Sequence, residues 1–161
     1  MLNLVEVWLP YGAATNVPNK IVVHSMGEFI DSHDRDYSAW EWLQKLGLSA
    51  HALVRPDGSV VLCRKPSQGA YHAKGYNTGS LGIEFLVPGV HTYTTFLDAI
   101  DAQGWVTEQQ LQAGIELVGE WMRKFDIEKG CIVQHSQISP GRKWDPGKGF
   151  PWSDFLAALK G

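Results

Sequence analysis

The stretch 81-LGIEFLV-87 indicates most about how this chain folds. Apolar side chains occupy every second position of it: Leu81, Ile83, Phe85 and Val87. This alternation predicts a β-strand with one face against a hydrophobic core. Glu84 points to the opposite face, and a carboxylate within an apolar strand costs free energy unless something pairs with it or uses it. Glu84 is therefore a candidate functional residue.

Other segments predict the rest of the sheet. Strand-like runs occupy residues 20–24 (KIVVH), 52–55, 59–63 and 131–133. Asp57-Gly58 separates two of these runs and indicates a tight hairpin turn. Together with residues 81–87, the sequence predicts about five strands.

Helical segments alternate with these strands. The clearest helix starts at Thr107, whose hydroxyl is placed to cap it while Gln110 reaches back. Its apolar side chains recur at helical spacing: Leu111, Ile115, Val118, Met122 and Phe125. Further helices are expected over Tyr37–Leu46 and Ser153–Leu159. The pattern predicts an α/β fold in which a central mixed sheet is flanked by helices, with residues 1–161 as a single domain.

Composition and charge exclude several classes of protein. The chain has 161 residues, 44% of them hydrophobic, which is enough for a real core and excludes a disordered chain. Its net charge is −3 with no basic block, which argues against a nucleic-acid binder that neutralises phosphates but leaves local binding of an acidic polymer open. Met1–Pro10 contains no basic residue and Glu6 interrupts its apolar run. We therefore expect neither a secretion signal nor a membrane span, and synthesis in the cytoplasm.

Two histidines and an aspartate form a candidate metal site. His24 and His135 each follow an apolar run, so both imidazoles are expected at strand ends, where they can converge. Asp145 lies in the loop that follows His135, between Trp144 and Pro146. Two histidines and one carboxylate leave the fourth position of a tetrahedral zinc ion open, which is typical of catalytic sites rather than structural ones.

Two further charged residues complete a candidate hydrolytic site. Zinc makes water more acidic and polarises a carbonyl. Glu84 is placed to orient and deprotonate a water molecule. Lys143, two residues before Asp145, is placed to stabilise the negative charge of a tetrahedral intermediate. The combination predicts metal-assisted hydrolysis of an amide or ester.

Each candidate also has a structural explanation. A histidine taken alone is more often a hydrogen-bonded structural or surface residue, and Glu84 alone can be a salt-bridged sheet residue. Cys131 and His135 have the spacing of a zinc ligand pair, but no second pair accompanies them, so Cys131 is better explained as a core residue. Trp144 and Trp152 flank the proposed site, where they are candidates for contact with a sugar.

Five segments of the chain resemble a known enzyme family. They are IVVH at 21–24, SAHALVRPDGSV at 49–60, AYHAKGYN at 70–77, SLGIEF at 80–85 and HSQISPGRKWDPGKGFPW at 135–152. The last of these is the most specific. The sequence is similar to the zinc-dependent N-acetylmuramoyl-L-alanine amidases, which include amidase-type phage lysozymes, the bacterial anhydro-muropeptide amidase and animal peptidoglycan recognition proteins.

The resemblance implies roles for the same residues. His24, His135 and Asp145 would bind one zinc ion, Glu84 would be the acid/base carboxylate and Lys143 would stabilise the oxyanion. The bond cleaved would join the lactyl group of N-acetylmuramic acid to L-alanine. The fold implied is a mixed sheet flanked by helices, with a zinc groove on one side.

Other positions are placed by the resemblance alone. His72 would line the groove and contact the substrate or the intermediate, whereas His51 is interpreted as structural. In the amidase-type phage lysozymes, a catalytic tyrosine precedes the His51 position and the third ligand is a cysteine. Here these residues are Ala50 and Asp145, and Glu84 stands at a position that is not glutamate in those enzymes, which favours the version of the site that uses glutamate and aspartate. The segment HAKGYN, in contrast, is similar to the phage enzymes.

We therefore expect a zinc amidase, acting as a monomer on peptidoglycan or muropeptides, with no nucleic-acid partner and no membrane insertion. Cell-wall lysis is the first interpretation. Cytosolic recycling of anhydro-muropeptides and non-catalytic recognition of peptidoglycan are the alternatives. The segment Pro88–Gly104 is expected to be a long loop that edges the groove and selects between polymer and fragments. Its alternative role is that of a surface insertion packed on the helix after Thr107.

Overall fold

Two long parallel strands form the centre of the sheet. Strand β2 (Lys20–Asp31) pairs with β6 (Ser80–His91) along most of their length. The computed structural model describes residues 1–160, and within them the sheet has seven strands. The order is β1-β5-β4-β6-β2-β3, with β7 also paired to β2. The remaining strands are β1 (Leu4–Glu6), β3 (Asp36–Ser38), β4 (Ala52–Val54), β5 (Val60–Leu62) and β7 (Ile132–Gln134).

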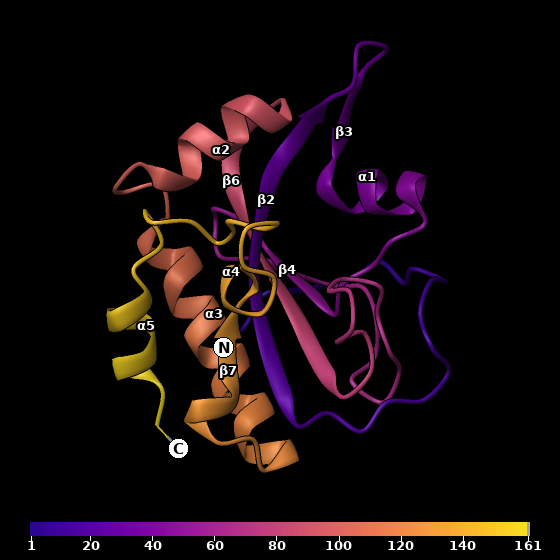
Figure 1. The fold of residues 1–161 in the computed structure, drawn as a ribbon, viewed down its shortest axis with the longest axis vertical. Helices are drawn as coiled ribbons and strands as arrows, with labels where there is room; N and C mark the ends of the chain where they lie inside the picture. Colours follow the sequence, from indigo (N-terminus) through magenta and orange to yellow (C-terminus); the bar gives the residue numbers. More distant parts are fainter. Residues whose placement is uncertain (161) are drawn as a thin grey trace.

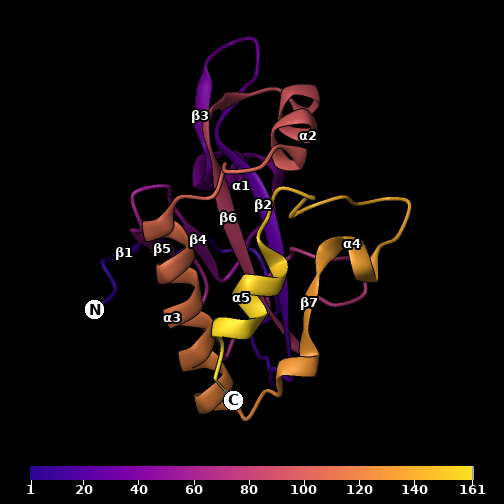
Figure 2. The ribbon, with the colours of Figure 1, turned by 90° about the vertical axis from the view of Figure 1, so that its left-hand side faces the viewer.

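Helices cover both faces of this mixed sheet (Figure 1). Helix α3 (Glu108–Phe125) and helix α5 (Trp152–Ala158) lie against one face, as Figure 2 shows from their side. Helix α1 (Ala39–Leu46) lies on the other face, and α2 (Tyr93–Asp101) packs beside β6 and β2. A short helix, α4 (His135–Ile138), follows β7. No helix within residues 1–160 is both long and apolar enough to cross a membrane.

The alternation of β6 divides the core into two clusters. The odd positions Leu81, Ile83, Phe85 and Val87 pack into the larger cluster, which includes residues of α3 and α5. Leu86 packs into the smaller cluster together with Leu43 of α1. Glu84 has the same parity as Leu86, so it faces away from the larger core, as the sequence predicts.

The edge of β2 is covered by two different strands. β7 pairs with β2 at Ile21–Val23, and β3 pairs with it only from Phe29 onward. Between these two segments, the loop after α4 approaches β2, and the Ser25 hydroxyl donates a hydrogen bond to the Pro146 carbonyl at 3.2 Å. Because neither β7 nor β3 pairs with β2 between Val23 and Phe29, this part of the β2 edge is open to the loop, which therefore lies next to His24.

The structure corrects several details of the expected fold. Strands β1 and β3 add to the expected five. Each has only three residues, which is too few for a pattern of alternating apolar and polar side chains to be recognised. Tyr37 lies in β3, and α1 begins at Ala39 because Ser38 is its N-cap, with Glu41 closing a capping box. Cys63 is buried, and Cys131, in a 3-10 turn that precedes β7, is half-buried and packs against the larger core cluster.

The segment Pro88–Gly104 is not a loop for most of its length. Its first residues extend β6 as far as His91, and α2 follows. The Thr92 hydroxyl accepts a hydrogen bond from the backbone N–H of Thr95 and so caps the helix. The helix buries Ile100 in the core. The sequence predicts a loop here because turn-forming residues stand on both sides of the helix, Pro88 and Gly89 before it and Gly104 after it.

Helix α3 approaches β6 closely at Gly114. A Cβ atom at this position would lie 2.3 Å from Cζ of Phe85, so we expect Gly114→Ala to lower the free energy of unfolding by about 1–3 kcal/mol. Gly119 in the same helix is the matched control, because its Cβ would meet only Arg123, at 3.4 Å. Gly119→Ala is expected to raise the free energy of unfolding by about 0.5–1 kcal/mol. Urea denaturation measures the change in the free energy of unfolding for each variant. Changes of the same sign in the two variants would contradict the close packing of Gly114 on Phe85.

Candidate active site

Three buried side chains converge at one point beside β2. His24 lies on β2, and His135 follows β7, whose Gln134 is paired with Val23. The two Nδ1 atoms are 3.0 Å apart. Oδ2 of Asp145 lies 3.2 Å from Nδ1 of His24 and 3.1 Å from Nδ1 of His135. The structure thus brings together the three residues that the sequence predicts as metal ligands.

The main chain brings Asp145 back to the start of α4. The backbone N–H of Ser136 donates to the Asp145 carbonyl at 3.0 Å. The neighbouring Pro146 carbonyl accepts the bond from Ser25 described above. These two contacts fix the loop at both sides of the carboxylate, so its position does not depend on contacts with the imidazoles alone.

This donor set fits a divalent metal ion. Ligand atoms about 2.0–2.2 Å from a tetrahedral zinc ion lie about 3.3–3.6 Å from one another, close to the spacing here. A single proton can link only one pair of the three atoms, whereas a cation interacts with all three. His24, His135 and Asp145 form a group that could hold a metal, since their ligand atoms lie within 4.8 Å of one another.

The protonation states also suit metal binding. Burial lowers the pKa of His24 and outweighs the opposing effect of Asp145, so its imidazole is neutral at pH 7. Burial alone would raise the pKa of Asp145, but the imidazoles of His135 and His24 beside the carboxylate more than compensate and hold that pKa below its ordinary value. A neutral imidazole and an ionised carboxylate are the forms that bind metals.

Glu84 lies directly beside this group. It is the cross-strand partner of His24, and its Oε1 is 3.9 Å from Nδ1 of His24. Its Oε2 is buried and has no hydrogen-bond partner among residues 1–160. Burial raises the pKa of Glu84 well above its ordinary value, the charge of Asp145 adds to this rise, and Lys143 opposes it. Glu84 is therefore a carboxyl group that can exchange a proton next to the candidate metal site.

A groove of about 770 Å³ opens over these residues. His24, Glu84, His135, Lys143 and Asp145 all line it. Its apolar walls come largely from α1 and α2: Trp42, Leu43, Leu46, Tyr93, Phe96 and Leu97. The segment expected to edge the groove does so, although mainly as a helix rather than as a loop.

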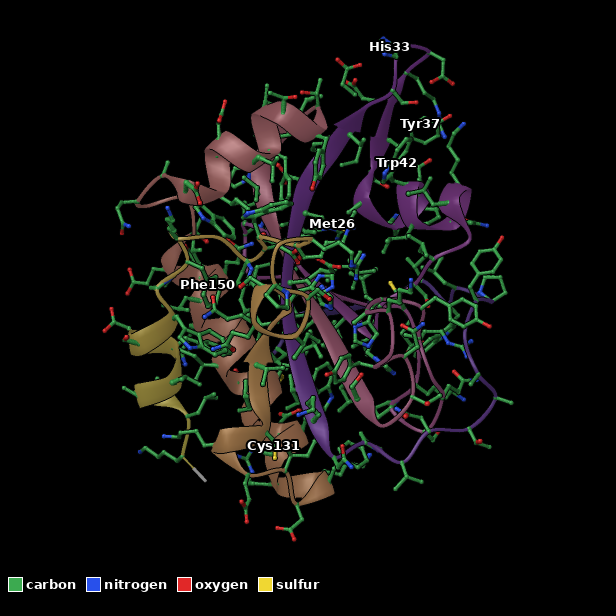
Figure 3. The ribbon with its side chains drawn as sticks, viewed as in Figure 1. Met26, His33, Tyr37, Trp42, Cys131 and Phe150 are labelled. Carbon is green, nitrogen blue, oxygen red and sulfur yellow. The ribbon has the colours of Figure 1, made fainter. Side chains whose placement is uncertain are left out.

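The two tryptophans near the site differ in position. Trp144 lines the groove and is 53% exposed. Trp152 instead packs on Phe150 and Phe155, with ring centroids 6.3 and 5.9 Å away. Figure 3 shows Phe150 on the α5 side of the sheet and Trp42 on the α1 side. The expectation that Trp152 flanks the site is therefore wrong, because α5 holds it in the larger core.

His72 lies in the groove wall, behind His24. Its Nδ1 is 2.8 Å from Nε2 of His24, and its Nε2 is 2.9 Å from Oγ of Ser80. The resemblance placed His72 in the groove. The contact with His24 could not be predicted from the spacing of the two residues, because they are 48 positions apart and His72 lies in the loop before β6.

His51 is a buried structural residue. Its Nε2 donates to the Gln68 carbonyl at 2.8 Å, and its Nδ1 accepts from the backbone N–H of Gly82 at 3.0 Å. Both ring nitrogens thus link neighbouring backbone segments. This arrangement requires a neutral imidazole, and burial lowers the pKa of His51 from 6.5 to about 4.

The pKa of His51 predicts a pH dependence of stability. The unfolded chain gains a proton at this residue as the pH falls below 6.5, whereas the folded chain does so only near pH 4. Stability is therefore lost between these values, by up to about 3 kcal/mol. With zinc removed from both proteins, the difference in unfolding free energy between the wild type and His51→Asn is expected to narrow by that amount from pH 7 to pH 4. Parallel pH profiles for the two proteins would contradict this assignment.

Comparisons with known proteins agree with this geometry. Residues 14–148 match the family described as N-acetylmuramoyl-L-alanine amidase. N-acetylmuramoyl-L-alanine amidase A of Achromobacter lyticus is 24% identical over 96% of this chain and 93% of its own length. The 1,6-anhydro-N-acetylmuramyl-L-alanine amidase AmpD of Citrobacter freundii is 30% identical over 88% of this chain and 81% of its own length.

Solved structures show the same fold. The endolysin N-acetylmuramoyl-L-alanine amidase LysCS from Clostridium intestinale superimposes with a TM-score of 0.73 at 25% identity, covering 99% of this chain and 96% of LysCS. A selenomethionine derivative of AmpD superimposes with a TM-score of 0.76 at 23% identity, with the same coverage. The matching segment spans the candidate metal ligands, Glu84 and Lys143, and the chain belongs to the N-acetylmuramoyl-L-alanine amidase family.

Proposed function

We propose that this amidase cleaves the bond between the lactyl group of N-acetylmuramic acid and L-alanine with a zinc ion held by His24, His135 and Asp145. One observation carries the proposal: the three ligand atoms lie 3.0–3.2 Å from one another with the Glu84 carboxyl beside them. When bound, zinc supplies a Lewis acid that polarises a carbonyl and makes water more acidic. In this proposal residues 1–161 form one catalytic domain.

Glu84 is assigned the proton transfers. Its carboxylate takes a proton from the attacking water while the water oxygen forms a bond to the lactyl carbonyl carbon. When the C–N bond breaks, the same carboxyl group gives the proton to the amine of L-alanine. The buried, unpartnered Oε2 supports this role, because it has no competing hydrogen bond to lose.

Lys143 is assigned the stabilisation of the oxyanion. It lines the groove two residues before Asp145 and is half-buried, so its charge acts in a partly water-excluded site. A cation beside the carbonyl oxygen stabilises the tetrahedral intermediate more than the neutral substrate, which lowers the barrier.

The substrate we propose is the peptidoglycan polymer, with action on the cell wall. The structural likeness to the endolysin LysCS supports this, as does Trp144, which offers an exposed ring at the groove for stacking on a sugar. The alternative is a soluble anhydro-muropeptide processed in the cytosol, which the similarity to AmpD supports. The chain is proposed to act as a monomer, since the metal ligands, Glu84 and Lys143 all belong to one chain.

Product analysis distinguishes these substrates. Zinc-loaded protein is incubated with intact sacculi and, separately, with anhydro-muropeptide monomer, each with and without a chelator, and the products are identified by mass spectrometry. Free stem peptide with L-alanine at its N-terminus is expected from sacculi and is expected to disappear with the chelator. Release from the monomer alone would assign the protein to recycling. Absence of release from both substrates would contradict the proposal and favour non-catalytic recognition of peptidoglycan.

A further inference from the structure

A line of hydrogen bonds leads from the candidate metal site into the protein. Nε2 of His24 is 2.8 Å from Nδ1 of His72, and Nε2 of His72 is 2.9 Å from Oγ of Ser80. The Ser80 hydroxyl donates in turn to the Tyr76 carbonyl. The line ends at a backbone carbonyl, which can only accept, so the direction of every bond is determined.

The direction assigns the proton of each imidazole. Because the Ser80 hydroxyl donates to Tyr76, it accepts from His72, whose proton is therefore on Nε2. Nδ1 of His72 is then an acceptor, and His24 must carry its own proton on Nε2. This leaves Nδ1 of His24 with a free lone pair, and that atom is the one that faces His135 and Asp145.

Gly82 and Asn77 fix the position of the His72 ring. A Cβ atom at residue 82 would lie 2.6 Å from Cγ and Nδ1 of His72, so only the glycine of β6 lets the ring lie against that strand. Oδ1 of Asn77 accepts from the backbone N–H groups of His72 and Ala73, both at 2.9 Å, and fixes the loop. The rings of His72 and His24 meet edge to face with centroids 5.0 Å apart.

The other candidate ligands and neighbours lack this arrangement. Nε2 of His135 is buried without a hydrogen-bond partner among residues 1–160. His51 lies near His72, with ring centroids 6.0 Å apart, but its two nitrogens bond to backbone groups of Gln68 and Gly82. His24 is therefore the histidine ligand candidate whose second nitrogen is anchored by another side chain.

We propose that His72 is a positioning residue that holds His24 in the tautomer and orientation needed for metal binding, with Ser80 and Gly82 supporting its ring. The inference rests on the proposed zinc site and deepens it. Because both His72 nitrogens are engaged within the protein, contact with substrate is not its main task. Partners that orient a histidine ligand typically contribute about 10–100-fold to metal affinity.

Zinc affinity of two variants tests this role. His72→Phe keeps a flat ring but removes the acceptor, and we expect it to weaken zinc binding about 10–100-fold in a competition assay with a chromophoric chelator. His72→Asn places Oδ1 near the position of Nδ1, where it accepts from His24, and is expected to bind zinc within about threefold of the wild type, on the basis of that retained hydrogen bond. His51→Asn is the matched control, expected to lower the melting temperature without changing zinc affinity.

A measurement on the unmodified protein complements the variants and does not depend on their folding. Long-range proton–nitrogen NMR correlations identify the protonated nitrogen of each imidazole. We expect Nε2 to carry the proton in both His24 and His72, with and without zinc. A proton on Nδ1 of His72, or wild-type zinc affinity in folded His72→Phe, would overturn the proposal. If the wild type binds no zinc, the proposed metal site fails instead, and the tautomers in the metal-free protein still decide the role of His72.

Discussion

Glu84→Gln is expected to lower kcat by about 10²–10⁴-fold while the protein keeps its zinc. The amide has nearly the same shape as the carboxylate but cannot take a proton from water. Glu84 has an unpartnered Oε2 and lies beside His24 without belonging to the close cluster of ligand atoms, so its loss should affect the chemical step more than metal binding. Release of stem peptide gives the rate, and elemental analysis gives the zinc content.

Glu28→Gln is the control for this variant. Glu28 lies on the same pair of strands, where its Oε1 accepts from the backbone N–H of Gly89, and it does not line the groove. This control is expected to retain wild-type kcat. The role assigned to Glu84 would be abandoned if zinc-loaded Glu84→Gln kept more than about a tenth of the wild-type kcat, since general acid–base groups contribute at least about 100-fold.

Asp145→Ala is expected to lose both zinc and activity. Structural zinc sites with four ligands bind with about 10–16 kcal/mol, or roughly 2.5–4 kcal/mol per ligand, so removing one of three protein ligands should weaken binding on the order of 10²–10³-fold. The two imidazoles would also lose the carboxylate that contacts both of their Nδ1 atoms. Isothermal titration of the metal-free protein with zinc measures the change.

Two further variants separate ligand loss from general destabilisation. Asp145→Cys supplies a thiolate, which is itself a good zinc ligand, and is expected to restore most of the affinity. Asp154→Ala removes an exposed carboxylate of α5 and is expected to bind zinc like the wild type. Equal zinc affinity in Asp145→Ala and the wild type would show that the carboxylate is not a ligand.

The parts of the fold that could be predicted are those with long, regular patterns. The alternation at residues 81–87 and the stripe from Leu111 to Phe125 report burial on one side, which is a property of consecutive residues. Strand β6 and helix α3 follow from these patterns, and so does the orientation of Glu84. Short elements carry too few residues for a period, and for this reason β1 and β3 were missed.

The candidate site could be predicted only in part, for a similar reason. His24 and His135 follow apolar strands, so their convergence can be inferred from a parallel sheet, and Asp145 follows in the adjacent loop. The support of His24 by His72 depends on a contact between distant segments. Its one local sign is Gly82, an unusual residue within an apolar strand, which marks a close approach of another group.

Titration of the metal-free protein with zinc, with stem-peptide release measured at each addition, tests the central claim most directly. The structure holds one cluster of candidate ligands within residues 1–160. The rate of release is therefore expected to be negligible without zinc, to rise linearly, and to level off at one zinc ion per chain. Undiminished release by the metal-free protein, or no release at full zinc occupancy, would contradict the assignment of a zinc amidase site to His24, His135 and Asp145.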